Sequence, residues 1–137
     1  MSDDKARYEK IRVLLIEDES YTRHVIEGLL RQIGFTLISQ AKDGGEGFKE
    51  TVRVRPQVVL CDVHMEPVDG LDYLSKLRGF ANPAIAATPV VFLTADKQQE
   101  TVVSAKQLKV DGYLVKPVSL QLLKQRLDAL LKFHSLI

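Results

Sequence analysis

Residues able to do chemistry lie directly after four short apolar runs of this chain. A pair of acids follows one run, an aspartate a second, a threonine a third and a lysine a fourth. In chain order these residues are Glu17-Asp18, Asp62, Thr94 and Lys116. If the runs are strands of one parallel sheet, their carboxyl ends meet at one edge, which is where open α/β sheets bind ligands. We therefore expect these side chains to form one site.

The charges of such a site indicate its chemistry. Three carboxylates packed together repel one another and resist ionisation unless a divalent cation neutralises them. Oxygen ligands favour Mg²⁺ (or Mn²⁺) over zinc or copper, and Mg²⁺ typically takes one or two carboxylates with water and a substrate phosphate. Lys116 and the Thr94 hydroxyl are suited to hold phosphoryl oxygens, while Asp62 is the candidate nucleophile that would form an acyl phosphate.

Five β-type runs are expected to position these residues. Four of the runs are nearly all apolar, as in strands that are buried on both faces of a parallel sheet, and the second run is mixed. The predicted strands are Ile11 to Ile16, Thr36 to Gln40, Gln57 to Cys61, Pro89 to Leu93 and Gly112 to Val115.

Helix-like segments separate the runs. Two of them, Ser20 to Ile33 and Ser119 to Phe133, are amphipathic, with Ser20 and Ser119 as predicted N-caps and Gly34 as the end of the first. Strict alternation of strand and helix predicts a doubly wound parallel sheet, because each crossover between parallel strands needs a helix. The weaker helical segments run from about Gly44 to Arg55, from Gly70 to Arg78 and from Lys97 to Lys109.

Length and composition bound the organisation of the chain. With 137 residues it has room for one domain with a core. The 19 Lys and Arg nearly balance the 18 Asp and Glu, so no overall electrostatic field favours nucleic acid or anionic lipid. We predict a polar N-terminal extension (residues 1–10), a domain of residues 11–133 and a tail of residues 134–137. Residues 79–88 are interpreted as a surface loop.

Nothing in the sequence indicates secretion or membrane association. The first ten residues are polar and charged, which is typical of neither a signal peptide nor an anchor. The longest mostly apolar stretch, Ala84 to Leu93, is too short to span a bilayer. The single cysteine, Cys61, lies within an apolar run, and no disulfide within the chain is possible. We predict a cytoplasmic protein without membrane insertion.

Four local motifs resemble the signature of response-regulator receiver domains. They read VLLIEDE from Val13, DVHMEPVDG from Asp62, VFLTA from Val91 and DGYLVKP from Asp111. Each motif alone is weak, but their order and their place at the ends of strands make the combination specific. The resemblance covers about Ile11 to Phe133. It implies a single-domain regulator with a flavodoxin-like α/β fold, a doubly wound five-stranded parallel sheet of order 2-1-3-4-5 with five helices.

The resemblance also implies roles in phosphoryl transfer. Asp62 would accept a phosphoryl group from a phosphohistidine on a sensor histidine kinase or a histidine phosphotransfer protein. Lys116 would contact that group, oriented by a cis peptide bond to Pro117. The implied Mg²⁺ ligands are Asp18 and Asp62 directly, Glu17 through water, and the backbone carbonyl of His64.

A conformational switch is implied as well. Thr94 would shift toward the phosphoryl group and Tyr113 would rotate inward to fill the vacated space, a response to one covalent change of charge. His64 and Asp96 would tune the lifetime of the acyl phosphate. The output surface would comprise the fourth helix, fifth strand and fifth helix, roughly Lys97 to Phe133, and would bind a downstream protein target. The regulator would be a monomer or a phosphorylation-dependent dimer.

Two residues depart from the pattern of the family. The first acid is Glu17, where Asp is also common, and one extra methylene should be tolerable in a water-mediated role. Proline stands at Pro67, with Glu66 at the position where the family often has proline. We therefore expect the loop after Asp62 to be shaped differently, with phosphorylation unaffected.

Functions other than a switch are also compatible with parts of this pattern. A phosphohydrolase would use the same aspartyl chemistry, but no substrate pocket or cap domain is indicated, so we expect no enzyme beyond self-phosphorylation from small donors and autodephosphorylation. A phosphorelay intermediate or phosphate sink without its own output fits the sequence equally well. A scaffold that has lost phosphorylation is disfavoured because the acids and Lys116 are intact. DNA binding is disfavoured because no helix-turn-helix or winged extension follows Phe133.

Overall fold

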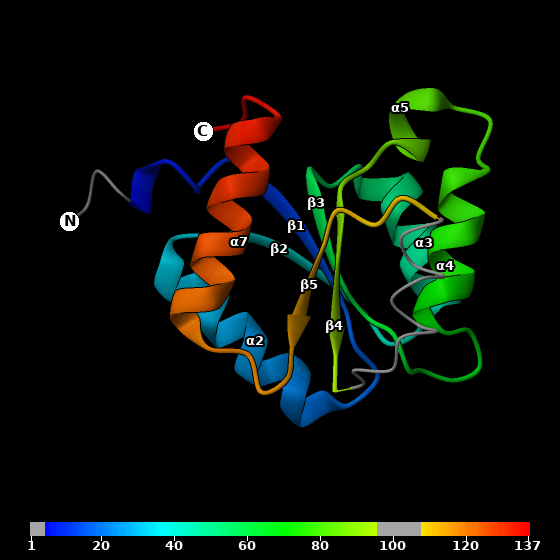
Figure 1. Cartoon of the computed structure of the whole chain (residues 1–137), viewed down its shortest axis with the longest axis horizontal. Coiled ribbons are helices and arrows are strands. Elements are labelled where there is room, and N and C mark those ends of the chain that lie inside the picture. Colours follow the sequence, from blue (N-terminus) through cyan, green and yellow to red (C-terminus); the bar gives the residue numbers. More distant parts are fainter. Residues whose placement is uncertain (1–4, 96–107) are drawn as a thin grey trace.

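The computed structural model describes residues 5–95 and 108–137. All but the last two residues of the predicted helix from Lys97 to Lys109 lie outside these ranges, as does Asp96. The core of the molecule is a five-stranded parallel sheet of order β2-β1-β3-β4-β5, which confirms the predicted flavodoxin-like order (Figure 1). The strands are β1 (Arg12–Ile16), β2 (Leu37–Ala41), β3 (Val58–Asp62), β4 (Val90–Thr94) and β5 (Gly112–Val115).

The strands begin and end within one residue of their predicted bounds. Five consecutive residues are buried in β3 and another five in β4, as expected for central strands that are covered on both faces. Asp62 and Thr94 are the last residues of β3 and β4, whereas the sequence predicts that each directly follows its strand. Their side chains therefore stand on backbone that the sheet itself holds in place.

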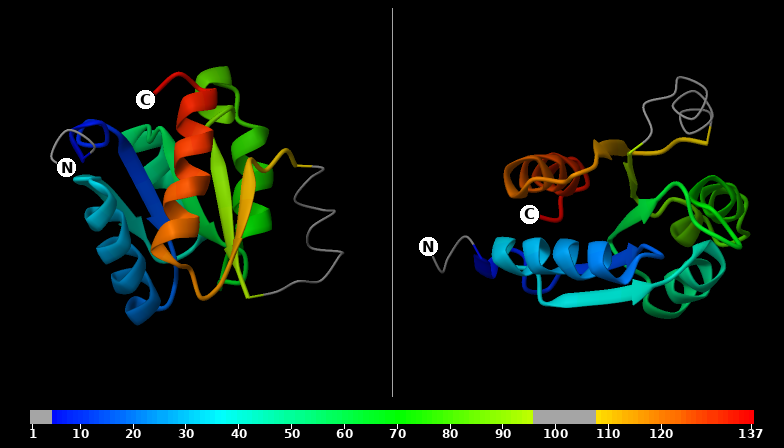
Figure 2. Two further views of the ribbon diagram at one scale, coloured as in Figure 1. Left: turned by 60° about the vertical axis from the view of Figure 1, so that its left-hand side comes forward. Right: turned by 90° about the horizontal axis from the view of Figure 1, so that it is seen from below.

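Helices cover both faces of the sheet (Figure 2). On one face, α2 (Ser20–Ile33) and α7 (Leu120–Phe133) bury leucine and isoleucine side chains against β1, β3 and β4. On the other face, α3 (Gly44–Val54) and α4 (Gly70–Arg78) pack around the fully buried Tyr73. The sheet with one helical layer on each face is the doubly wound architecture that strand and helix alternation predicted.

Two of the three predicted helix ends are confirmed. Gly34 ends α2 with a φ of 132° and donates its backbone N–H to Leu30, and the Ser119 hydroxyl accepts from the backbone N–H of Leu122 at 3.1 Å. The prediction for Ser20 was wrong, because Ser20 is the first residue of α2 and the N-cap is Glu19. The backbone carbonyl of Glu19 accepts the N–H of Arg23 at 2.9 Å and so starts the helix one residue earlier.

Residues 79–88, interpreted from the sequence as a surface loop, contain the short helix α5 (Pro83–Ala86). Asn82 caps it by accepting from the backbone N–H of Ala84 at 3.0 Å. The Arg78 guanidinium donates to the carbonyls of Ala86 and Thr88, both at 2.8 Å, and so fastens the segment to α4. Within the described ranges, none of the helices combines the length and apolar character needed to cross a bilayer.

Candidate functional site

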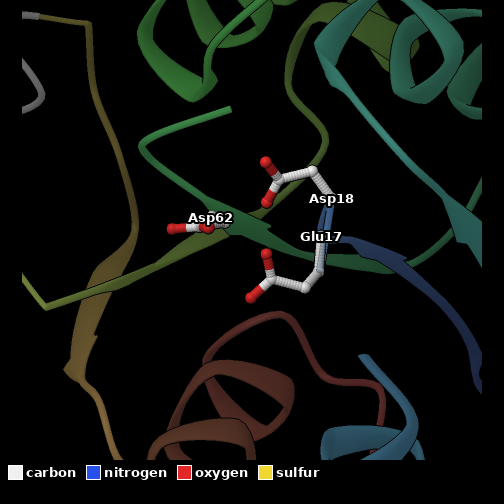
Figure 3. A group of neighbouring side chains, drawn as sticks. All are labelled: Glu17, Asp18 and Asp62. Carbon is white, nitrogen blue, oxygen red and sulfur yellow. The ribbon is translucent and has the colours of Figure 1, made fainter. Parts of the chain in front are cut away.

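Three carboxylates gather at the carboxyl ends of β1 and β3 (Figure 3). Glu17 and Asp18 follow β1, and Asp62 ends β3. Each offers an oxygen atom within 4.8 Å of the others. Glu17 is completely buried and Asp62 nearly so, whereas Asp18 is exposed. The sequence prediction that these acids meet at one edge of the sheet agrees with this geometry.

Lys116 adds one positive charge to the three acids. It directly follows β5 and its backbone N–H donates to the Thr94 carbonyl at 2.9 Å. Its Nζ lies 2.6 Å from Glu17 Oε1 and 3.1 Å from Asp62 Oδ2. The peptide bond to Pro117 is cis. We call Glu17, Asp18, Asp62 and Lys116 the acidic edge.

The acidic edge carries more negative charge than Lys116 can neutralise. Burial raises the pKa of Glu17, its contact with Asp62 raises it further, and the hydrogen bond from Lys116 opposes both. Burial and the neighbouring Glu17 also raise the pKa of Asp18. Raised pKa values in a cluster of carboxylates are the sign of mutual repulsion and incomplete solvation. A divalent cation would relieve both.

The donor set fits a hard cation such as Mg²⁺. All three side chains of the cluster offer carboxylate oxygens, which Mg²⁺ prefers over the softer ligands that zinc and copper favour. A hollow of about 530 Å³ opens beside Asp18 and is also lined by His64, Glu66 and Asp69. Mg²⁺ usually keeps several waters, and this open, polar side would accommodate them.

Thr94 reaches the same edge from β4. It is buried and pairs in register with Val115, while Asp62 pairs with Leu93, so Thr94 lies one residue beyond Asp62 on the neighbouring strand. Four strands thus contribute to one end of the sheet, as predicted from the ends of the apolar runs.

The remaining predicted site residues are Tyr113, His64 and Asp96. Tyr113 is half-buried on β5, with its ring edge-to-face against Phe92 at 6.2 Å between centroids, and burial raises its pKa. His64 is exposed in the loop two residues after Asp62. Asp96 lies outside the described residues. The loop after Asp62 contains a second cis peptide bond, between Glu66 and Pro67.

Two residues that support the site were missed from the sequence. Gly70, interpreted only as the start of a helix, packs so closely that a Cβ there would lie 2.5 Å from the Asp62 carbonyl oxygen. Its N–H donates to the Val63 carbonyl at 2.8 Å, so the start of α4 rests on the backbone of Asp62 and Val63. Arg23 on α2 donates to the Glu17 carbonyl at 2.8 Å. The pair Asp69-Gly70, at the end of the motif that begins at Asp62, was the only sequence signal for Gly70, and no signal pointed to Arg23.

Comparison with known proteins places this architecture in a family. The model of the response regulator receiver domain matches residues 13–128. Chemotaxis protein CheY-3 of Vibrio cholerae is 31% identical over 118 residues, which cover 86% of this chain and 89% of that protein. Chemotaxis protein CheY of Pseudomonas aeruginosa is 30% identical over 118 residues, which cover 86% of this chain and 94% of that protein.

Solved structures show the same likeness. The structure of Vibrio cholerae chemotaxis protein CheY4 at low pH has a TM-score of 0.80 and 25% identity, covering 88% of this chain and 98% of that one. A putative response regulator from Chloroflexus aurantiacus also has a TM-score of 0.80, with 26% identity and coverage of 90% and 99%. With the acidic edge at the expected place in the fold, this chain belongs to the response-regulator receiver domains of two-component signalling.

Proposed function

We propose that this protein is a phosphorylation-controlled switch whose phosphoacceptor is Asp62. The observation that carries the proposal is the position of Asp62, at the end of a completely buried strand, 3.1 Å from Lys116 and beside two further acids. The donor would be a phosphohistidine on a sensor histidine kinase or a histidine phosphotransfer protein. The protein would act in the cytoplasm, and its own chemistry would be limited to phosphoryl acceptance and loss.

In the proposed transfer, a carboxylate oxygen of Asp62 attacks the phosphorus of the phosphohistidine. An O–P bond forms as the N–P bond breaks, and the electron pair of that bond returns to the imidazole nitrogen of the donor. Mg²⁺, when bound to Asp18 and Asp62, supplies positive charge for the carboxylates and the phosphoryl oxygens. Lys116 supplies a further positive charge beside Asp62, and the Thr94 hydroxyl offers a hydrogen bond to a phosphoryl oxygen.

The proposed signal leaves through β5 and α7. Lys116 follows β5 directly, and α7 begins four residues later, so a change in the contacts of Lys116 acts on both elements. Thr94 and Tyr113 would be the switching side chains, since Thr94 ends β4 and Tyr113 packs against Phe92 of the same strand. A downstream protein would bind this surface in the phosphorylated state.

A partly apolar hollow beside the acidic edge supports a protein as the phosphodonor. It has a volume of about 340 Å³ and is lined by Tyr21 and Val25 of α2, by Val118, and by Lys116. Tyr21 is 74% exposed although it is a large aromatic residue. Because Lys116 belongs to both the hollow and the acidic edge, a donor that reaches Asp62 would contact these apolar side chains. Tyr21→Ala should therefore slow transfer from a phosphohistidine protein and leave phosphorylation by acetyl phosphate unchanged.

Intact mass after incubation with acetyl phosphate and Mg²⁺ tests the phosphoacceptor. We expect a labile gain of roughly 80 Da, the mass of one phosphoryl group, that requires Mg²⁺ and is absent in Asp62→Asn. The matched control is Asp72→Asn, which alters an exposed aspartate on α4 and should be phosphorylated like the wild type. An equal gain in Asp62→Asn, or no gain in the wild type, would contradict the assignment.

A further inference from the structure

Residues 5–11 precede the region that matches the family model, yet they contribute to the core of the domain. The Tyr8 side chain is completely buried and Ile11 is 5% exposed, in a stretch whose other residues are charged apart from Ala6. Both belong to the cluster of buried side chains under α2 and α7. We call residues 5–11 the N-terminal brace.

Tyr8 joins the brace to α7 by polar contacts. Its hydroxyl donates to Asp128 Oδ1 at 2.6 Å and accepts from Lys124 Nζ at 3.2 Å. Lys124 and Asp128 lie one turn apart on α7 and pair with each other at 2.7 Å, so the three groups form a closed triangle. We call Tyr8, Lys124 and Asp128 the brace cluster. One phenol thus bonds two charged side chains of a single helix.

The brace is also fixed to the turn between α2 and β2. The Tyr8 ring packs against Phe35 with 5.0 Å between centroids, and the Thr36 hydroxyl donates to the Glu9 carbonyl at 3.0 Å. At Gly34 the chain has a positive φ, and a Cβ there would lie 2.8 Å from the Lys5 carbonyl oxygen. The brace therefore connects α7 to the end of α2 and the start of β2 (Figure 1).

Helix α7 is held at two places that differ in chemistry. Its beginning follows Lys116 and the cis peptide bond to Pro117, next to the acidic edge. Its second and third turns carry Lys124 and Asp128 and are bonded to Tyr8. We propose that the N-terminal brace is a conformational strap that restrains α7 from Lys124 onward, independently of the acidic edge. With Tyr8 seated this part of the helix is held, and with Tyr8 displaced it moves while the sheet stays folded.

The alternative is that Tyr8 only fills space in the core. The two roles differ in what the hydroxyl does, since Tyr8→Phe keeps the ring against Phe35 and removes both bonds to α7. Hydrogen bonds to charged groups are worth more than those between neutral groups, so their loss changes the opening of α7 measurably. A space-filling role predicts no change in α7 from Tyr8→Phe.

Hydrogen exchange measured amide by amide tests the strap. The relevant amides are those that exchange faster than global unfolding allows, because they report local opening. In Tyr8→Phe we expect such amides of α7 between Lys124 and Phe133 to exchange about tenfold faster. Those of α4, on the opposite face of the sheet, should be unchanged, because opening α4 breaks no contact of Tyr8. The matched control is Tyr21→Phe, at a tyrosine 74% exposed, which should alter neither helix.

Two results would contradict the proposal that the N-terminal brace acts as a strap. Unchanged exchange in α7 of Tyr8→Phe would mean that the bonds to Lys124 and Asp128 do not restrain the helix. Equal acceleration in α7 and α4 would mean that Tyr8 contributes only general stability. Neither result depends on phosphorylation of Asp62, so the strap and the proposed switch succeed or fail separately.

Discussion

The acidic edge and the brace cluster each contain one lysine beside carboxylates, but only the brace cluster has as many positive as negative charges. At the acidic edge one lysine faces three carboxylates. In the brace cluster one lysine faces one carboxylate, and the phenol of Tyr8 bonds both. The balanced cluster satisfies its own charges, whereas the unbalanced one keeps an excess of negative charge that a bound cation would offset. Carboxylates with perturbed pKa values in such a cluster are frequent at functional sites.

The pKa values follow the same division. Burial acts to raise the pKa of Asp128, but the hydrogen bonds from Lys124 and Tyr8 outweigh it and the pKa is lowered overall. At the acidic edge burial and like charge together raise the pKa of Glu17 and of Asp18. Ionisation of Asp128 thus stabilises the fold, while ionisation of Glu17 and Asp18 opposes it until a cation is present.

The largest expected effect breaks the balanced cluster. Tyr8→Ala removes a completely buried ring and both bonds to α7, and should lower the free energy of unfolding by about 3–5 kcal/mol. Urea denaturation at pH 7 measures this change. Tyr21→Ala, at an exposed tyrosine, should stay within about 0.5 kcal/mol of the wild type. Similar losses in the two variants would show that buried Tyr8 contributes no more to the free energy of unfolding than an exposed tyrosine.

The second effect concerns the cation at the unbalanced cluster. Asp18→Asn removes one of the carboxylates and should weaken Mg²⁺ binding by about 100-fold or more, since loss even of groups that only support metal ligands costs roughly 10–100-fold. Titration calorimetry with Mg²⁺ gives the affinity directly. Asp72→Asn serves as the control of equal charge change. Full Mg²⁺ affinity in Asp18→Asn would remove Asp18 from the ligands.

These effects separate what the sequence could predict from what it could not. Strand ends were predictable because buried runs such as Val58 to Cys61 stop at polar residues, and the meeting of Glu17, Asp62 and Lys116 followed from strand polarity. The burial of Tyr8 was not predictable, because a single aromatic in a polar stretch has no periodicity and its partners lie 116 and 120 positions away.

The N-cap of α2 and the contacts of Lys116 depend on local geometry that the sequence does not show. Ser20 and Glu19 both can precede a helix, and only the backbone geometry decides which is the cap. The closer approach of Lys116 to Glu17 than to Asp62 depends on side-chain reach across the sheet edge, which spacing along the chain does not encode. The roles of Thr94 and Tyr113 depend on motion and stay predictions. The roles of His64 and Asp96 stay predictions as well.

The stability that Tyr8 contributes should also depend on pH. Burial and the hydrogen bond to Asp128 raise the pKa of Tyr8 above its usual 10.0. A raised pKa in the folded state gives stability that is present below pH 10 and lost as pH rises through the folded value. The advantage of the wild type over Tyr8→Phe, about 1–1.5 kcal/mol, should thus be constant from pH 7 to 9 and shrink above pH 10. Urea denaturation across this range measures it, and an advantage that grows above pH 10 would contradict the sign.

The smallest effect is a gain in stability when one carboxylate of the acidic edge is removed. Without metal, Asp18→Asn should raise the free energy of unfolding by a few tenths of a kcal/mol, because Asp18 is exposed and solvent screens its repulsion with Glu17. Its raised pKa means that ionised Asp18 weakens the fold at pH 7, and the amide removes that penalty. Denaturation in EDTA is the measurement. A loss of stability would show that Asp18 is already satisfied without a cation.

The unequal burial of the strands bears on how long an acyl phosphate would last. Asp62 ends β3, which is paired on both sides and completely buried, whereas Lys116 follows β5, an edge strand with only Leu114 buried. Fraying begins at such edges. If β5 frayed in the phosphorylated protein, Lys116 would withdraw and water would reach the phosphoryl group, while Asp62 would stay in place. Under the proposed function, the rate of spontaneous dephosphorylation would rise with the fraying of β5, and a mutation far from Asp62 that tightens β5 would prolong the signal.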